Sequence, residues 1–168
     1  DRILVRDEYS RLIEACALSG NKYLKNMVLF SIETAIRVGE LLQMRYDHIN
    51  FDKHTLLIPE TKTGKPRTIP LSPKAIEILQ SMPRRLDGKI FPLTIDSLEH
   101  YFKIAKRKAK INGFRWHDLR RHACSLLFEK GLSTKNDVIN TGIIGINKDH
   151  LNKLDYFNHF EDNLTLMK

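Results

Sequence analysis

Two short β-rich segments lie in the middle of a chain whose other apolar residues recur at helical spacing. Residues 55–59 read Thr-Leu-Leu-Ile-Pro and residues 67–71 read Arg-Thr-Ile-Pro-Leu. Residues 61–66 between them are polar and contain a glycine, which is typical of a hairpin connection. Because proline has no backbone N–H to donate, the proline near the end of each segment indicates a small edge sheet and not a central one. Most of the core must therefore come from helices.

The apolar spacing on both sides of the hairpin predicts these helices. A first helix is predicted to end near Gly20, and its apolar positions follow the i, i+3, i+4, i+7 rule at Tyr9, Leu12, Ile13 and Cys16. Further helices are predicted over residues 22–34, from Val38 to Arg45, from Ser72-Pro73 to Ser81, from Asp96 or Ser97 onward, from Trp116 to Gly131, from Ser133 or Thr134 onward, and around Leu151, Leu154 and Tyr156. The predicted fold class is mainly α with a small antiparallel β-sheet (α+β), in one domain of 168 residues.

Composition narrows the classes of protein that fit. No apolar run approaches the roughly 20 residues that cross a bilayer, so we expect no membrane partner. The chain begins without Met, and we expect an excised domain. Cys16 and Cys124 lie in apolar, helical stretches, which favours two buried free thiols and a reducing cytoplasm, with a single disulfide as the alternative. No Cys/His spacing is typical of a zinc site, so neither metal nor cofactor is predicted.

The charge of the chain favours a polyanionic partner. Its net charge is +8 and its pI is about 9.5. Nucleic acid is the commonest such partner, although excess lysine also serves solubility. The helical segment over residues 103–110 concentrates the charge, and its predicted DNA-binding residues are Lys103, Lys106, Arg107 and Lys110. A merely solvated helix face is the alternative interpretation of this segment.

Three further segments carry polar residues that a simple core does not explain. Arg37 stands at a helix start with Glu40 one turn later, which allows an ion pair. His117 and Arg120 are three residues apart and project from one helix face, where they could form an anion clamp. Tyr156 lies late in the chain among aromatic residues. Taken singly, each segment fits a structural role as well as a functional one.

The order of these segments resembles the tyrosine recombinase (phage integrase) family over nearly the whole chain. Residues 34–41 match that family's Thr-Gly-x-Arg-x-x-Glu-Leu motif, except that Ala35 replaces the glycine. Residues 61–67 correspond to its hairpin lysine motif, and residues 117–120 to its His-x-Leu-Arg motif. These three motifs, followed by the late Tyr156 as the fourth, stand in the right order and make this a specific resemblance. It implies the catalytic-domain fold of the DNA breaking-rejoining enzymes.

The resemblance also implies a mechanism. Tyr156 would attack a DNA phosphodiester, giving a 3′-phosphotyrosyl link and a free 5′-hydroxyl, so that no ATP is needed. Arg37 and Arg120 would clamp the non-bridging oxygens in the transition state. Lys62 would protonate the leaving 5′-oxygen, and His117 would assist proton movement.

The residues around this catalytic set would support it. Glu40 would hold Arg37 in place, and Lys65 and Arg67 would contact DNA. Asn147 stands nine residues before the nucleophile, where the family usually has His and sometimes Trp. An Asn can donate a hydrogen bond to phosphate but carries no charge. His150 is the alternative, although it lies three residues late.

The resemblance implies that the chain binds duplex DNA. It also implies that the chain forms a homotetramer on paired DNA sites and can be a monomer in isolation. Residues 157–168 are a candidate for the C-terminal segment that family members exchange. The family's separate N-terminal DNA-clamping domain is absent from residues 1–168, which we expect to be a single catalytic domain. Two alternatives stay open: a type IB topoisomerase, and a degenerate integrase-like chain that binds DNA without cutting it.

Overall fold

The computed structural model describes residues 2–59 and 66–129, with side chains up to residue 126. The helices are α1 (Arg6–Ala17), α2 (Leu24–Thr34), α3 (Val38–Leu42), α4 (Pro73–Ser81), α5 (Ile95–Lys108) and α6 (Trp116–Glu129), with a 3-10 turn η1 (Tyr46–His48). The strands are β1 (Ile49–Asn50), β2 (Thr55–Ile58) and β3 (Arg67–Pro70). This mainly helical fold with a small sheet confirms the predicted class. The helices predicted after residue 130 lie outside the described residues.

The strands form one antiparallel sheet in the order β1-β2-β3. Leu56 pairs with Ile69 across β2 and β3, and both side chains are buried, whereas Leu57 in the same strand is exposed. One face therefore packs on the core and the other meets solvent, as a period of two requires. The predicted hairpin strands are confirmed to within one residue. β1 was not predicted, because two residues are too few to show a strand period.

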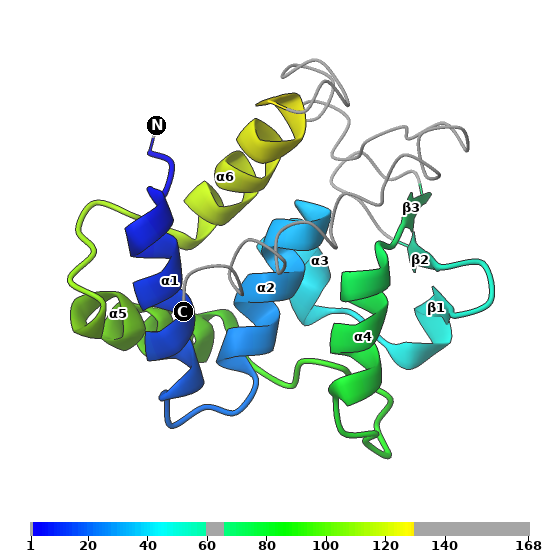
Figure 1. Cartoon of the computed structure of the whole chain (residues 1–168). Coiled ribbons are helices and arrows are strands. Elements are labelled where there is room, and N and C mark those ends of the chain that lie inside the picture. Colours follow the sequence, from blue (N-terminus) through cyan, green and yellow to red (C-terminus); the bar gives the residue numbers. More distant parts are fainter. Residues whose placement is uncertain (1, 60–65, 130–168) are drawn as a thin grey trace, which may run out of the picture.

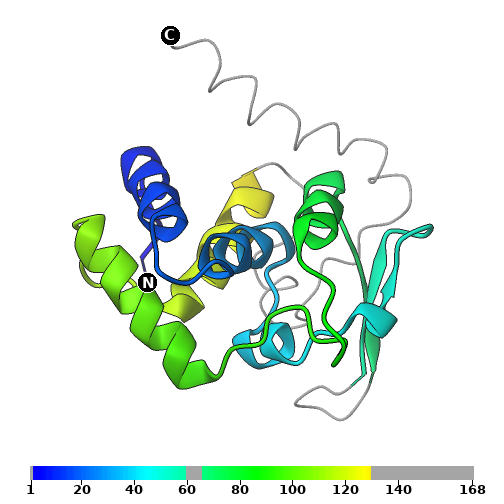
Figure 2. The ribbon, with the colours of Figure 1, turned by 90° about the horizontal axis from the view of Figure 1, so that it is seen from below.

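Helix α2 occupies the centre of the domain (Figures 1 and 2). It packs against α1, α4 and α6, which surround it on different sides. Its residues Leu24, Met27, Val28 and Phe30 are fully buried. A helix that is apolar on most of its circumference must be enclosed in this way to be stable. The loop that leaves α2 is consequently fixed at one end of the core.

Two predicted helix boundaries were wrong for identifiable reasons. Helix α5 was predicted to begin at Asp96 or Ser97, but its cap is Thr94. The Oγ1 of Thr94 accepts the backbone N–H of Ser97 at 3.2 Å. Helix α3 ends at Leu42 and not at Arg45. Arg45 is extended there and forms a β-bridge with Lys89. The predicted cap of α4 is confirmed, since Ser72 Oγ accepts the N–H of Ala75 at 3.1 Å.

Both cysteines of the chain are free and buried, as predicted. Burial raises the pKa of Cys16 to about 12, so its thiol stays protonated at neutral pH. Among residues 2–59 and 66–129 there is no helix with the length and apolar character of a membrane span.

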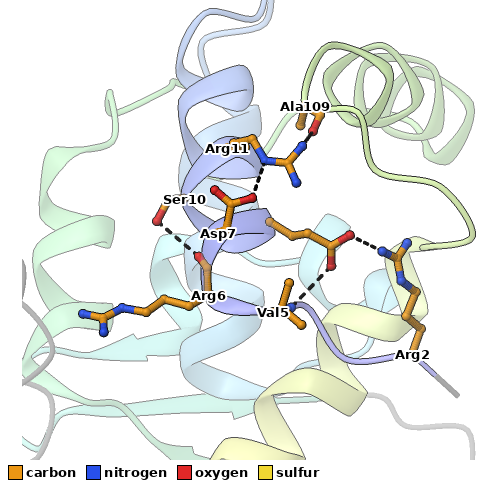
Figure 3. Close-up of polar contacts among 8 residues, drawn as sticks. Arg2, Val5, Arg6, Asp7, Ser10, Arg11 and Ala109 are labelled. Atoms are coloured by element: carbon orange, nitrogen blue, oxygen red, sulfur yellow. Dashed lines mark hydrogen bonds and ion pairs between the residues drawn. The ribbon is translucent and has the colours of Figure 1, made fainter.

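Arg11 links α1 to the far end of α5 (Figure 3). Its Nε donates to Asp7 at 3.0 Å, and its Nη1 donates to the backbone oxygen of Ala109, just after α5. A cation at that end of a helix complements both the free carbonyls and the helix dipole.

Replacing Arg11 with Met should therefore lower the free energy of unfolding by about 1 kcal/mol, because the charged hydrogen bond is only partly shielded from water. Urea denaturation would measure this change. Arg6→Met is the matched control, since Arg6 is exposed on the same helix and its guanidinium points away from Arg11 in Figure 3. Equal losses in both variants would contradict the proposed link.

Candidate active site

The loop between α2 and α3 turns on Ala35, whose φ is 50° and ψ is 26°. This left-handed conformation costs an L-residue about 1–2 kcal/mol relative to the right-handed one. The tyrosine recombinase motif has glycine at this position, and the backbone gives the physical reason. After this turn, the carbonyl of Ala35 accepts a hydrogen bond from Arg120, and the side chain of Arg37 lines a cleft.

Glu40 joins two arginines at this turn. Its carboxylate accepts the backbone N–H of Arg37 at 3.2 Å and Arg37 Nη1 at 3.2 Å. It also accepts both terminal nitrogens of Arg67, each at 2.8 Å, so that Arg67 is bidentate. The Glu40 side chain is 8% exposed, against 16% for Arg67 and 38% for Arg37. Burial acts to raise the pKa of Glu40, but the hydrogen bonds and charges of the two arginines outweigh it and hold that pKa below its ordinary value.

Helix α6 supplies the opposite wall of the cleft. Arg120 is buried, and its Nη1 donates to the carbonyl of Ala35. Burial, followed by the charge of Arg37, lowers the pKa of Arg120 below its ordinary value. His117, one turn earlier, is exposed at the rim. Burial of part of its ring, followed by Arg121 and Arg120, lowers the pKa of His117, so the imidazole is neutral at pH 7.

These side chains line a cleft of about 470 Å³. Its walls are formed by Ser31, Ile36, Arg37, Val38, Gly39, Glu40, Gln43, Trp116, His117, Leu119 and Arg120. The structure thus brings together Arg37, His117 and Arg120, which the sequence motifs predicted to share a site. Within the described ranges, no three His, Cys, Asp or Glu side chains form a group that could hold a metal ion.

Ser31 is a residue of this cleft that the sequence did not single out. It is 1% exposed, and its Oγ has no hydrogen-bond partner among the described residues. A buried hydroxyl without a partner costs free energy, and this one lies in the wall of the cleft that holds Arg37 and Arg120. One serine in an apolar helix gives no sequence signal that could have indicated this.

The other predicted site residues are distributed as follows. Lys62, Lys65, Asn147 and Tyr156 lie outside the described residues. Arg67, predicted to contact DNA, forms an ion pair with Glu40, and its DNA contact stays a prediction.

The basic helix α5 presents part of its predicted cationic surface to solvent. Lys103 and Arg107 are exposed on the helix, and Lys110 is exposed just after its end. Lys106 is half-buried and donates to the backbone oxygen of Phe114; burial lowers the pKa of its ammonium group. Lys103, Lys106 and Arg107 also line a second hollow of about 480 Å³.

Comparisons with known proteins agree with the motif resemblance. The model of the "Phage integrase family" matches residues 2–136. The chain is similar to a shufflon-specific DNA recombinase of Escherichia coli, with 38% identity over 112 residues, which is 64% of this chain and 29% of that protein. The chain therefore spans less than a third of the length of this relative.

Two solved structures extend the comparison to three dimensions. The catalytic domain of bacteriophage HP1 integrase superposes with a TM-score of 0.65 at 22% identity, covering 98% of this chain and 94% of that one, which supports the fold. A lambda integrase tetramer bound to a Holliday junction superposes with a TM-score of 0.63 at 25% identity, covering 82% of this chain and 45% of that one.

Replacing Ala35 with Gly should leave stability unchanged or raise it by up to about 1 kcal/mol, because the gain from relieving the left-handed conformation outweighs the extra entropy of an unfolded glycine. Ala15→Gly, in the interior of α1, is the control and should lose about 1 kcal/mol. Thermal or urea unfolding would compare the two. A similar loss at both positions would show that position 35 has no special backbone requirement.

The lowered pKa of Glu40 predicts a pH-dependent contribution to stability. The contribution is complete above the ordinary pKa of 4.5 and is lost as the pH falls through the lower folded value. Wild type should thus be more stable than Glu40→Gln at pH 7, and the difference should shrink below pH 4.5. Urea unfolding from pH 7 to pH 3 measures this. A difference that stays constant over the range would rule out the ion pair as its source.

Proposed function

The chain belongs to the phage integrase family, and on this premise we propose that it is a tyrosine recombinase catalytic domain that cleaves and rejoins duplex DNA through a 3′-phosphotyrosyl intermediate. The observation that carries the proposal is the convergence of Arg37, His117 and Arg120 on one cleft. These residues come from segments about 80 positions apart in sequence, so their meeting reflects the fold and not local spacing.

The cleft suits an anionic phosphodiester. Arg37, Arg67 and Arg120 bring three guanidinium groups around one carboxylate, that of Glu40, so positive charge remains in excess. Arg37 is the more exposed of the two predicted clamp residues, and Arg120 is held rigidly against the carbonyl of Ala35. Fixed donors of this kind stabilise the charge that develops on the non-bridging oxygens, and losing one typically costs about 10²–10³ in rate.

Proton transfer completes the proposed chemistry. A phenol with a pKa near 10 is a poor nucleophile at neutral pH, so Tyr156 needs a proton acceptor or a cationic field. The neutral imidazole of His117 can accept a proton, and the neighbouring arginines supply the field. Lys62 would return a proton to the leaving 5′-oxygen. Asn147 would donate a hydrogen bond to the phosphate.

DNA affinity would come mainly from phosphate contacts. Lys103, Arg107 and Lys110 form an exposed basic surface on and just after α5, to which Lys65 and Lys106 would add. Binding should accordingly weaken steeply as salt rises. By analogy with the lambda integrase tetramer, we propose that this chain works as a homotetramer on paired DNA sites and is monomeric without them. Its site of action would be the cytoplasm, where both thiols stay reduced.

A suicide-substrate assay tests the proposed function. Nicked duplexes carrying candidate attachment sites would be incubated with the protein without divalent metal, and covalent adducts would be separated on denaturing gels. Wild type should form an adduct, Tyr156→Phe should form none, and Arg120→Lys should form it about 10²–10³ times more slowly because the bidentate donor is lost.

The outcomes separate the alternatives. An adduct that persists in Tyr156→Phe would reject this nucleophile. Binding without an adduct, by wild type and mutant alike, would favour a degenerate chain, for which Asn147 in place of the usual His is the relevant sequence feature. Relaxation of supercoiled DNA without strand exchange would favour the topoisomerase alternative.

A further inference from the structure

The carboxylate of Glu40 is shared unequally between its two arginines. Arg67 reaches both oxygens through two bonds of 2.8 Å, although it lies 27 residues away in sequence. Arg37, only three residues away, bonds one oxygen through Nη1 at 3.2 Å. Its other bond to Glu40, also at 3.2 Å, comes from the backbone N–H. The stronger partner of Glu40 is therefore Arg67.

This division has a consequence for Arg37. A bidentate pair is the strongest arrangement between a guanidinium and a carboxylate, and it uses two of the nitrogens that could otherwise bind phosphate. Within the described part of the chain, Arg37 commits only Nη1 of its guanidinium to Glu40. The remaining donors are left for a ligand in the cleft, where the Arg37 side chain is 38% exposed.

We propose that Arg67 is a positioning residue: by binding both oxygens of Glu40, it keeps this carboxylate from closing onto Arg37 and so preserves the Arg37 guanidinium for phosphate. The inference rests on the proposed role of the cleft as a phosphodiester site. Arg67 itself does not touch the substrate. It acts through Glu40, from the first residue of strand β3.

Removal of Arg67 would change both the geometry and the charge of the cleft. Glu40 is almost fully buried, so its carboxylate would turn to the nearest remaining cation, which is Arg37. A phosphate would then compete with that carboxylate for the Arg37 donors and would also meet its unbalanced negative charge. Neutralising Glu40 in the same protein should remove both effects.

A double-mutant cycle tests this proposal. The variants are Arg67→Met, Arg67→Lys, Glu40→Gln, and Arg67→Met combined with Glu40→Gln. Inorganic phosphate would be titrated into each at pH 7 and low salt, with the fluorescence of Trp116 as the readout. Trp116 is the single tryptophan of the chain and lines the cleft, so it reports binding without any need for cleavage. Urea unfolding would verify that each variant is folded.

We expect Arg67→Met to bind phosphate about tenfold more weakly than wild type, consistent with the loss of about one charge-assisted hydrogen bond. Adding Glu40→Gln should recover most of that affinity. Arg67→Lys should lie between Arg67→Met and wild type, because lysine keeps the charge but not the planar fork. If Arg67→Met does not fold, the lysine variant carries the test.

Several results would overturn the proposal. The first is that Arg67→Met binds phosphate as tightly as wild type does. The second is that adding Glu40→Gln to Arg67→Met weakens phosphate binding further. The third is that wild type binds no phosphate at all. Lys103→Met is the control for a DNA-contacting residue, since it should lower the salt dependence of duplex binding without changing the phosphate titration. If Arg67→Met likewise lowered the salt dependence of duplex binding and left the phosphate titration unchanged, Arg67 would bind DNA directly.

The covalent-adduct assay keeps this inference separate from the proposed function. The expected phosphate pattern without an adduct would support the role of Arg67 and reject the recombinase chemistry. If wild type and Arg67→Met formed the adduct at equal rates and bound phosphate with equal affinity, the recombinase chemistry would be supported and the role of Arg67 rejected.

Discussion

The ion pairs of Glu40 are the interaction on which the geometry of the cleft depends. One nearly buried carboxylate fixes the start of α3 through Arg37 and connects it to β3 through Arg67. A buried carboxylate is tolerated only where partners compensate its desolvation, and two guanidinium groups do so here. The sheet and the helical core are thereby held in register at the position where the proposed chemistry takes place.

The turn at Ala35 adds a second constraint from the backbone. Its left-handed conformation ends α2 and directs a carbonyl toward Arg120, which comes from a helix 85 residues later. The buried guanidinium of Arg120 needs such an acceptor, and a backbone carbonyl remains an acceptor at any pH because it does not ionise. Because α2 is packed on several sides, the turn and the arginine have little freedom to move. Rigidity of this kind is what a phosphate clamp requires.

Much of the fold and part of the site could be predicted because the relevant signals are local. Apolar spacing indicated α1 and α2, proline and glycine indicated the hairpin, and Ser72-Pro73 indicated the start of α4. The short strand β1 and the end of α3 could not be predicted in this way. Their limits depend on pairing with β2 and on the bridge between Arg45 and Lys89, which join segments distant in sequence.

The sequence by itself determined the family and the helical class, and it predicted that Arg37, His117 and Arg120 share one site, because motif order and residue type can be read along the chain. Only the tertiary structure decided which partner each charge takes. Arg67 faces Glu40, and Arg120 faces the Ala35 carbonyl. Ser31 lies in the cleft wall with no hydrogen-bond partner among the residues that the structure describes. The physical reason is that ion pairing and desolvation depend on distances in space, and packing sets these distances between residues that the sequence keeps far apart.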